Sequence, residues 1–97
     1  MFEAYDNRGR VYADIKNYHL AIQDYTKAIE LDPDHACGEY GSRGLSYLGL
    51  HDRDKAKDDF IKACNYGNNS KCDYNSIIKP ACDRLKKMDE EDARGPE

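Results

Sequence analysis

Cysteine and histidine are the side chains in this 97-residue sequence best suited to binding metals or to redox chemistry. The cysteines are Cys37, Cys64, Cys72 and Cys82, and the histidines are His19, His35 and His51. No two cysteines form a Cys-x-x-Cys pair, the spacing typical of zinc sites and of redox-active dithiols. Each histidine stands alone in or beside an expected turn, so we interpret all three as surface residues. The sequence therefore predicts no metal site.

Enzymatic chemistry is not indicated either. No spacing places a serine or cysteine nucleophile beside a histidine base. The carboxylate pair Asp58–Asp59 falls on a solvated helix face, and Asp59 recurs 35 residues after Asp24, which favours a structural role over acid–base catalysis. The seven glycines are scattered and do not form a phosphate-binding loop. We therefore expect a protein that is not an enzyme and that holds no cofactor.

The net charge of −4 is concentrated at the C-terminal end. Residues 1–88 carry 14 acidic and 14 basic side chains, whereas residues 89–97 carry five acidic side chains and one arginine. Because phosphate binding needs clustered lysine and arginine, the balanced body argues against nucleic acid as a partner. We expect residues 89–97 to be a disordered acidic tail, with a binding tail as the alternative interpretation.

The composition indicates a folded domain outside the membrane. Charged residues make up 35% of the chain and the mean hydropathy is −0.98. The longest mostly apolar stretch, Gly44–Leu50, is far shorter than the roughly 20 residues that span a bilayer. No membrane partner is therefore expected, and the start of the chain does not resemble a signal peptide. Eight tyrosines and regularly spaced leucine, isoleucine and alanine still offer enough apolar surface for a core.

A repeat with an offset of 35 residues organises the chain. The pattern Tyr5-x-x-Arg8-Gly9-x-x-Tyr12 recurs as Tyr40-x-x-Arg43-Gly44-x-x-Tyr47. Further matches follow at the same offset: Ala21 with Ala56, Asp24 with Asp59, Tyr25 with Phe60, Lys27 with Lys62, and Ala28 with Ala63. The apolar positions within each half have helical spacing, so each unit is predicted to be two antiparallel helices. The small glycine and alanine side chains would let the aromatic rings of the facing helix approach closely.

Breaks in the helical pattern divide the chain. Turns are expected at 16–18 and 49–52 within the units, at 32–34 after the first unit, and at 66–70 after the second. The predicted organisation is a first repeat at 2–35, a second repeat at 36–70, a capping helix at 71–88 and the acidic tail at 89–97. Pro80 either kinks the capping segment or begins a second short helix there.

The string Asn7-Arg8-Gly9-x-x-Tyr12, followed by Asn17-Tyr18-x-x-Ala21-Ile22-x-x-Tyr25-x-x-Ala28-Ile29-Glu30-Leu31-Asp32-Pro33, resembles a tetratricopeptide repeat. Residues 36–70 resemble it too, although Arg53 stands where the first unit has Tyr18 and Asn68 where it has Pro33. The resemblance implies an all-α fold of about five helices, with helix-turn-helix repeats stacked as a short right-handed α-solenoid.

The resemblance also implies a concave groove, lined by the first helix of each repeat, that binds a peptide or a partner protein. The matching positions are Glu3, Asp6, Asn7, Arg10, Ala13 and Asp14 in the first unit, and Gly38, Gly41, Ser42, Leu45, Leu48 and Gly49 in the second. Members that bind chaperone tails hold a terminal carboxylate with lysine and asparagine at such positions, and because Asp6 and Gly41 differ we expect no such clamp. The groove would be charged at Asp6, Arg10 and Asp14, unless these three form only a solvated face.

A protein-binding module is the leading functional prediction. The alternative is a structural role in which repeats stack end to end, giving a homodimer through the exposed first helix or the cap. Cysteine-rich secreted relatives of the superfamily carry a bridge with spacing similar to Cys64 and Cys72, which implies a disulfide here; the alternative is that both are reduced and buried. Cys82 is expected in the core and Cys37 partly exposed. A cytoplasmic location is favoured, with export as the alternative if Cys64 and Cys72 are bridged.

Overall fold

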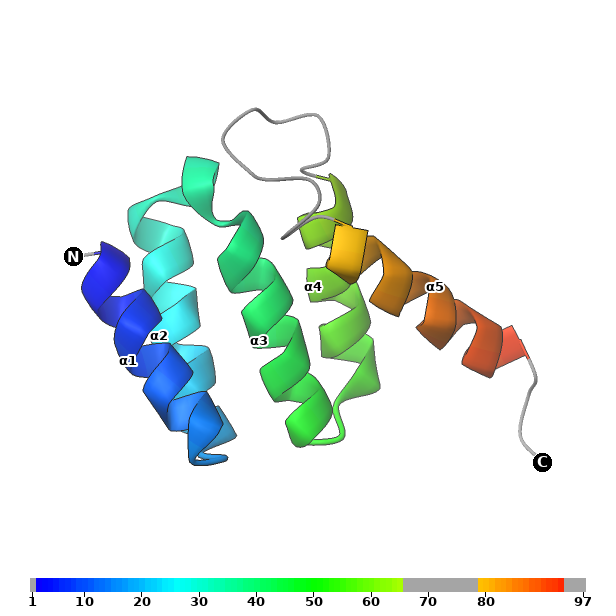
Figure 1. Cartoon of the computed structure of the whole chain (residues 1–97), viewed down its shortest axis with the longest axis horizontal. Coiled ribbons are helices and arrows are strands. Elements are labelled where there is room, and N and C mark those ends of the chain that lie inside the picture. Colours follow the sequence, from blue (N-terminus) through cyan, green and yellow to red (C-terminus); the bar gives the residue numbers. More distant parts are fainter. Residues whose placement is uncertain (1, 66–78, 94–97) are drawn as a thin grey trace.

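The computed structural model describes residues 2–65 and 79–93, and these residues form five α-helices and one short 3-10 helix. The elements are α1 (Phe2–Asp14), α2 (Tyr18–Leu31), η1 (Pro33–His35), α3 (Cys37–Gly49), α4 (Arg53–Asn65) and α5 (Lys79–Ala93). Each helix packs against the next one along the chain, so that two hairpins and a fifth helix form a single stack (Figure 1). The predicted all-α solenoid is confirmed.

Both hairpins turn in the same way. Two residues after the first helix of each hairpin ends, the backbone is left-handed, at Lys16 with φ 65° and at His51 with φ 64°, and these two positions are 35 residues apart. The amide of the following residue then returns to a carbonyl five residues earlier: Asn17 N–H donates to Tyr12 at 2.8 Å, and Asp52 N–H to Tyr47 at 2.9 Å. This pairing satisfies carbonyl groups that the helix end would otherwise leave open. The turns predicted at 16–18 and 49–52 are thereby confirmed.

The second helices begin and end where the sequence predicts. The side chains of Asn17 and Asp52 accept hydrogen bonds from Leu20 N–H at 3.5 Å and from Lys55 N–H at 3.2 Å, which caps α2 and α4. The first unit ends at Pro33, which begins the 3-10 turn between α2 and α3. The turn predicted at 66–70 lies outside the described residues.

The core of each hairpin is built from the residues that recur. Tyr25 is buried among the small residues of the first hairpin, and Phe60 occupies the same place in the second. Gly9 and Gly44 make this possible, because a β-carbon at Gly9 would lie 2.9 Å from the Tyr25 ring and one at Gly44 would lie 2.9 Å from the Phe60 ring. The close approach expected at both glycines is therefore confirmed in matching surroundings.

Replacing Gly44 with alanine is expected to destabilise the protein relative to the matched Gly41→Ala variant. Both glycines lie in α3, so both substitutions gain helix propensity of about 1 kcal/mol. A β-carbon at Gly41 meets nothing within 4 Å, whereas the one at Gly44 must displace Phe60. Overpacking of this kind costs about 1–3 kcal/mol, which is the expected difference between the two variants in urea unfolding. Equal stabilities would contradict the packing role of Gly44.

Each hairpin also contains an ion pair at the same offset, formed with a buried aspartate. Arg8 binds Asp24 through two hydrogen bonds of 2.8 Å, and Arg43 binds Asp59 through two of 2.8 Å. Tyrosine rings flank each guanidinium, with centroids 5.4 to 5.9 Å away. Planar guanidinium groups match both the carboxylate fork and the ring faces. The structural role predicted for Asp59 is confirmed, but the solvated face predicted for the Asp58–Asp59 pair is wrong for Asp59, which is buried against Arg43.

The α5 helix corrects two of the sequence predictions. It continues through Ala93, so the predicted boundary at Met88 and the disorder predicted from Asp89 onward are wrong for 89–93. Ion pairs to α4 hold this extension: Asp89 to Lys57 at 2.7 Å, and Glu91 to Arg53 at 3.3 Å. Pro80 is the second described residue of α5, a position where its missing N–H costs no hydrogen bond; residues 71–78, which decide whether a helix precedes it, lie outside the described residues.

The disulfide prediction is wrong in its partner. Cys64 is bonded to Cys82, which joins the end of α4 to the first turn of α5, and Cys72 lies outside the described residues. Cys37 is buried and disulfide-bonded, in contrast to its expected partial exposure. Ala81 and Met88 of α5 complete the apolar cluster around Phe60. Among the described helices, none combines the length and the apolar character needed to cross a membrane.

Candidate functional site

The candidate site is a pocket of about 290 Å³ where α1, α3 and α5 meet. Its apolar surfaces come from the exposed Leu45 on α3, the ring of Phe60 on α4, and Ala81 on α5. Gly38 and Gly41 contribute no side chain to the α3 wall of the pocket, and Pro80 of α5 also lines it. A pocket of this size accommodates one or two side chains of a ligand, since pockets for whole small molecules measure about 300–1,000 Å³.

Two arginines face this pocket from opposite helices. Arg10 on α1 is exposed and forms an i, i+4 ion pair with Asp6 at 3.4 Å. Arg84 on α5 is exposed and, within residues 2–65 and 79–93, forms no ion pair. The polar part of the pocket is thus mainly cationic, and Arg84 is available to pair with an acidic group.

A buried carboxyl pair lies beside Arg10. Glu39 on α3 is only 5% exposed and is hydrogen-bonded to Asp6 on α1. Burial, followed by the hydrogen bond to Asp6 and the negative charge of Asp6, raises the pKa of Glu39 to about 8. At neutral pH the Glu39 carboxyl group therefore carries the proton of this hydrogen bond. The bond joins the first hairpin to the second.

The Tyr25 hydroxyl makes a second connection of the same kind. Burial raises its pKa, and the nearby Asp6 carboxylate raises it further, while a hydrogen bond to Ser42 lowers it. Tyr25 lies on α2 and Ser42 on α3, so this bond also joins the two hairpins. The wall of the pocket at Ser42 is therefore held by the first hairpin.

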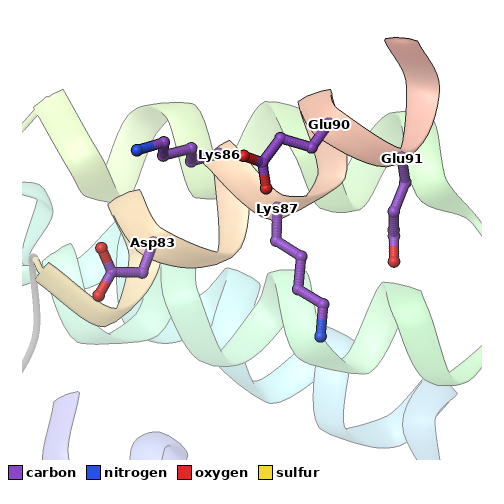
Figure 2. Close-up of a pocket in the computed structure, with 5 residues that line it drawn as sticks. All are labelled: Asp83, Lys86, Lys87, Glu90 and Glu91. Carbon is purple, nitrogen blue, oxygen red and sulfur yellow. The ribbon is translucent and has the colours of Figure 1, made fainter. Parts of the chain in front are cut away.

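Among the described residues, α5 alone lines a second hollow, of about 430 Å³. Its lining residues are Asp83, Lys86, Lys87, Glu90 and Glu91. Figure 2 shows Lys87 and Glu91 extending from one side of this helix and Lys86 in another direction. Because a single helix supplies every described lining residue and all of these residues are charged, we interpret the hollow as a solvated helix face. In the described part of the chain, no three metal-ligating side chains gather at one point.

The first hairpin matches a known repeat family. The family model that describes the tetratricopeptide repeat aligns with residues 2–35, the range of α1, α2 and η1. Residues 2–35 are a tetratricopeptide repeat. The second hairpin repeats the aromatic, glycine, alanine and ion-pair positions of this tetratricopeptide repeat at an offset of 35, and folds in the same way.

Two curated relatives share this part of the chain. The protein named heat shock protein sti1 homolog, from Schizosaccharomyces pombe, is 36% identical over 66 residues, which is 68% of this chain and 11% of the relative. Heat shock protein STI1 of Saccharomyces cerevisiae is 32% identical over 59 residues, or 61% of this chain and 10% of the relative. The chain thus spans about a tenth of the length of these relatives. No solved structure matches it significantly. The tetratricopeptide repeat and these relatives support a protein–protein interaction module.

The pocket gathers only part of the predicted groove. From the tetratricopeptide repeat it includes Arg10, and from the second hairpin it includes Gly38, Gly41, Ser42 and Leu45. The remaining predicted groove residues lie elsewhere: Glu3, Asn7 and Asp14 are exposed, Asp6 binds Glu39 and Arg10, and Ala13 is half-buried. Two others serve packing, because Leu48 contacts the apolar cluster and Gly49 lies against the ring of Tyr18.

Five residues at the site were missed from the sequence, of which Ala81 lies on the first turn of α5. Phe60 had been assigned to the core alone, and Glu39 had drawn no prediction. Pro80 and Arg84 belong to the segment predicted as a capping helix, which was not assigned to the groove. The available signal was the helical spacing of Pro80 and Arg84, four residues apart, which puts both on one face of α5.

Proposed function

We propose that the chain is a peptide-binding module whose ligand inserts an acidic side chain, next to an apolar one, into the pocket between α1, α3 and α5. The observation that carries this proposal is the pair Arg10 and Arg84, which face an apolar surface formed by Leu45 and Phe60. A carboxylate between two guanidinium groups gains charge-assisted hydrogen bonds. An aliphatic neighbour in the ligand would cover Leu45.

The charges around the pocket favour this class of ligand over a basic or neutral one. Arg84 and the nearby Lys87 form no ion pair within the described ranges, whereas the acidic side chains nearest the pocket, Asp6 and Glu39, are bonded to each other. Asp6 also holds Arg10, so a ligand carboxylate would compete with Asp6 for that guanidinium. Because the pocket is small, we expect affinities of about 10 μM or weaker for short peptides.

A capped peptide library read by fluorescence polarisation tests the proposal. The peptides carry acetylated and amidated ends, so that a terminal carboxylate cannot supply the charge. We expect binders enriched in aspartate or glutamate beside leucine, isoleucine or methionine. Arg84→Glu and Arg10→Glu should each weaken them at least tenfold, since a hydrogen bond to a charged group contributes about 1.5–3 kcal/mol.

Lys86→Glu is the matched control, because Lys86 is an exposed base on α5 that does not line this pocket. Lys86→Glu should change the affinity by less than threefold, because its charge acts on the ligand only at long range. Binders that are basic, or acidic binders that tolerate both arginine substitutions, would show that the ligand does not occupy this pocket.

A further inference from the structure

The outer face of α1 carries an exposed stripe that the proposed binding function does not use. Ala4, Arg8 and Val11 of α1 and Ile15, the first residue after it, follow one another at spacings of four, three and four residues. Because Ile15 N–H still donates to the Val11 carbonyl at 3.1 Å, all four lie along one side of the helix. Val11 is 58% exposed and Ile15 is 66% exposed, which is unusual for β-branched apolar side chains in a small domain. α1 is the first helix of the stack, and no described element covers this side of it (Figure 1).

The internal repeat shows what such a face normally contacts. At an offset of 35 the stripe corresponds to Glu39, Arg43, Ser46 and Leu50. In the second hairpin the first three of these are largely or fully buried, and α2 of the first hairpin packs against α3 there. The side chain of Arg43 is 14% exposed, whereas that of Arg8 is 59% exposed. The same face is therefore covered by a helix in one hairpin and open in the other.

The hydrogen bonds of the two arginines show the same difference. Arg43 binds Asp59 and also donates from Nη1 to the Thr26 hydroxyl of α2 at 3.0 Å. Arg8 binds Asp24 in the same way, and in the described part of the chain it has no counterpart of the bond to Thr26. The open face thus keeps an unused guanidinium donor beside its two apolar side chains.

We infer that a second copy of this chain covers the stripe, with the two α1 helices packed antiparallel about a two-fold axis. The spacings of four, three and four read the same in both directions, so the stripe is complementary to itself on reversal. A two-fold interface requires this, because each contact must occur twice. In this register Ala4 faces Ile15 of the second copy, which pairs a small side chain with a large one, and Arg8 faces Val11.

The charges at the ends of the stripe favour the antiparallel orientation. Glu3 lies near the start of α1 and Lys16 in the turn after its end, so an antiparallel arrangement brings the acidic end of one helix to the basic end of the other; both side chains are exposed. A parallel arrangement would instead bring Glu3 near Glu3 and Lys16 near Lys16. Because α1 is 13 residues, or about 20 Å, the interface is small, and we expect a weak dimer with a Kd on the order of 100 μM.

Sedimentation velocity on the whole chain, from about 10 μM to 1 mM, tests this inference. The wild-type mass should rise from monomer toward dimer across that range. Ile15→Glu should remain monomeric, because it buries two carboxylates against Ala4. Ile61→Glu, the same change at an exposed isoleucine on α4 at the other end of the stack, should dimerise like the wild type. Far-UV circular dichroism confirms that each variant keeps its helices.

The double variant Ala4→Lys with Ile15→Glu decides the register, because each lysine then faces a glutamate of the second copy. Dimerisation should return to within about threefold of the wild-type Kd, and salt should weaken it. A wild-type chain that stays monomeric at 1 mM overturns the inference. So does a dimer that Ile15→Glu leaves intact, or a double variant that remains monomeric.

Discussion

Replacing Arg43 with methionine is expected to lower the free energy of unfolding by about 3–5 kcal/mol. Methionine keeps much of the length of the side chain but cannot donate to Asp59, which is almost fully buried. The Asp59 carboxylate would then remain inside the second hairpin without the two 2.8 Å bonds that balance its charge. Removing one partner of a buried pair costs far more than the net value of the pair, because the other charge stays desolvated.

The matched change Arg8→Met should cost only about 1 kcal/mol. Arg8 makes the same two bonds to Asp24, but its side chain is mostly exposed, so water can reach Asp24 once the arginine is gone. Urea unfolding at pH 7, followed by circular dichroism, would measure the loss of unfolding free energy in both variants. Similar losses in the two variants would mean that exposure does not govern the cost of breaking these pairs. Both variants should be measured below 10 μM, so that a second copy of the chain does not cover Arg8 and reduce its exposure to water.

Replacing Glu39 with glutamine is expected to stabilise the protein at high pH and to leave it almost unchanged at low pH. The pKa of Glu39 is about 8 in the folded state, above its ordinary value of 4.5, so folding favours the protonated form. The stability that Glu39 contributes is therefore complete below pH 4.5, falls as the pH rises toward 8, and is constant above it. Each unit of pKa difference corresponds to about 1.4 kcal/mol, so the loss should reach a few kcal/mol.

Glutamine at position 39 stays neutral and can still donate a hydrogen bond to Asp6, so this pH dependence should disappear. Unfolding in urea at pH 5, 6, 7 and 8.5 would show the wild-type and variant stabilities diverging as the pH rises. Glu3→Gln is the control, since Glu3 is an exposed glutamate on α1 that should leave the slope unchanged. If the stabilities of the wild type and Glu39→Gln change in parallel with pH, Glu39 is not the group that is protonated on folding.

The helices and their pairing could be predicted because they depend on residues that recur within each hairpin. Gly44 and Phe60, or Arg43 and Asp59, lie 16 residues apart, and the first hairpin repeats both spacings. Contacts of this kind are determined by one supersecondary unit, and two copies of the unit in one sequence make the pattern visible. The prediction was therefore accurate wherever a contact stays inside a hairpin or recurs between hairpins.

The cap could not be predicted to the same degree. The Cys64–Cys82 pairing and the ion pair of Asp89 with Lys57 both depend on how α5 lies against α4. No second copy of that contact exists in the sequence, and the spacing of Cys64 and Cys72 suggested a different bridge. Charge composition alone predicted disorder from Asp89, whereas the bases of α4 supply partners that make the helix favourable there.

The pocket was predicted only on its α1 and α3 sides for the same reason. Arg10, Ser42 and Leu45 follow from their positions in the repeat, whereas Arg84 faces the pocket because of the orientation of α5. Glu39 is a further case, because its burial arises from the contact between hairpins and not from its own helix. The positions that remain as predictions for ligand binding are Asp6, Asn7, Arg10, Asp14, Ser42, Leu45 and Leu48.

The bridge between Cys64 and Cys82 ties α5 to α4 close to the first turn of α5. The cross-link holds that turn at a high effective concentration beside its neighbour, so fraying of α5 must start from the opposite end. There the last turn of the helix, beyond the buried Met88, is held by Lys57–Asp89 and Arg53–Glu91, which are exposed enough for dissolved ions to screen. Reductant and salt therefore loosen different ends of the same helix, while Leu85 and Met88 keep its middle packed against the apolar cluster around Phe60.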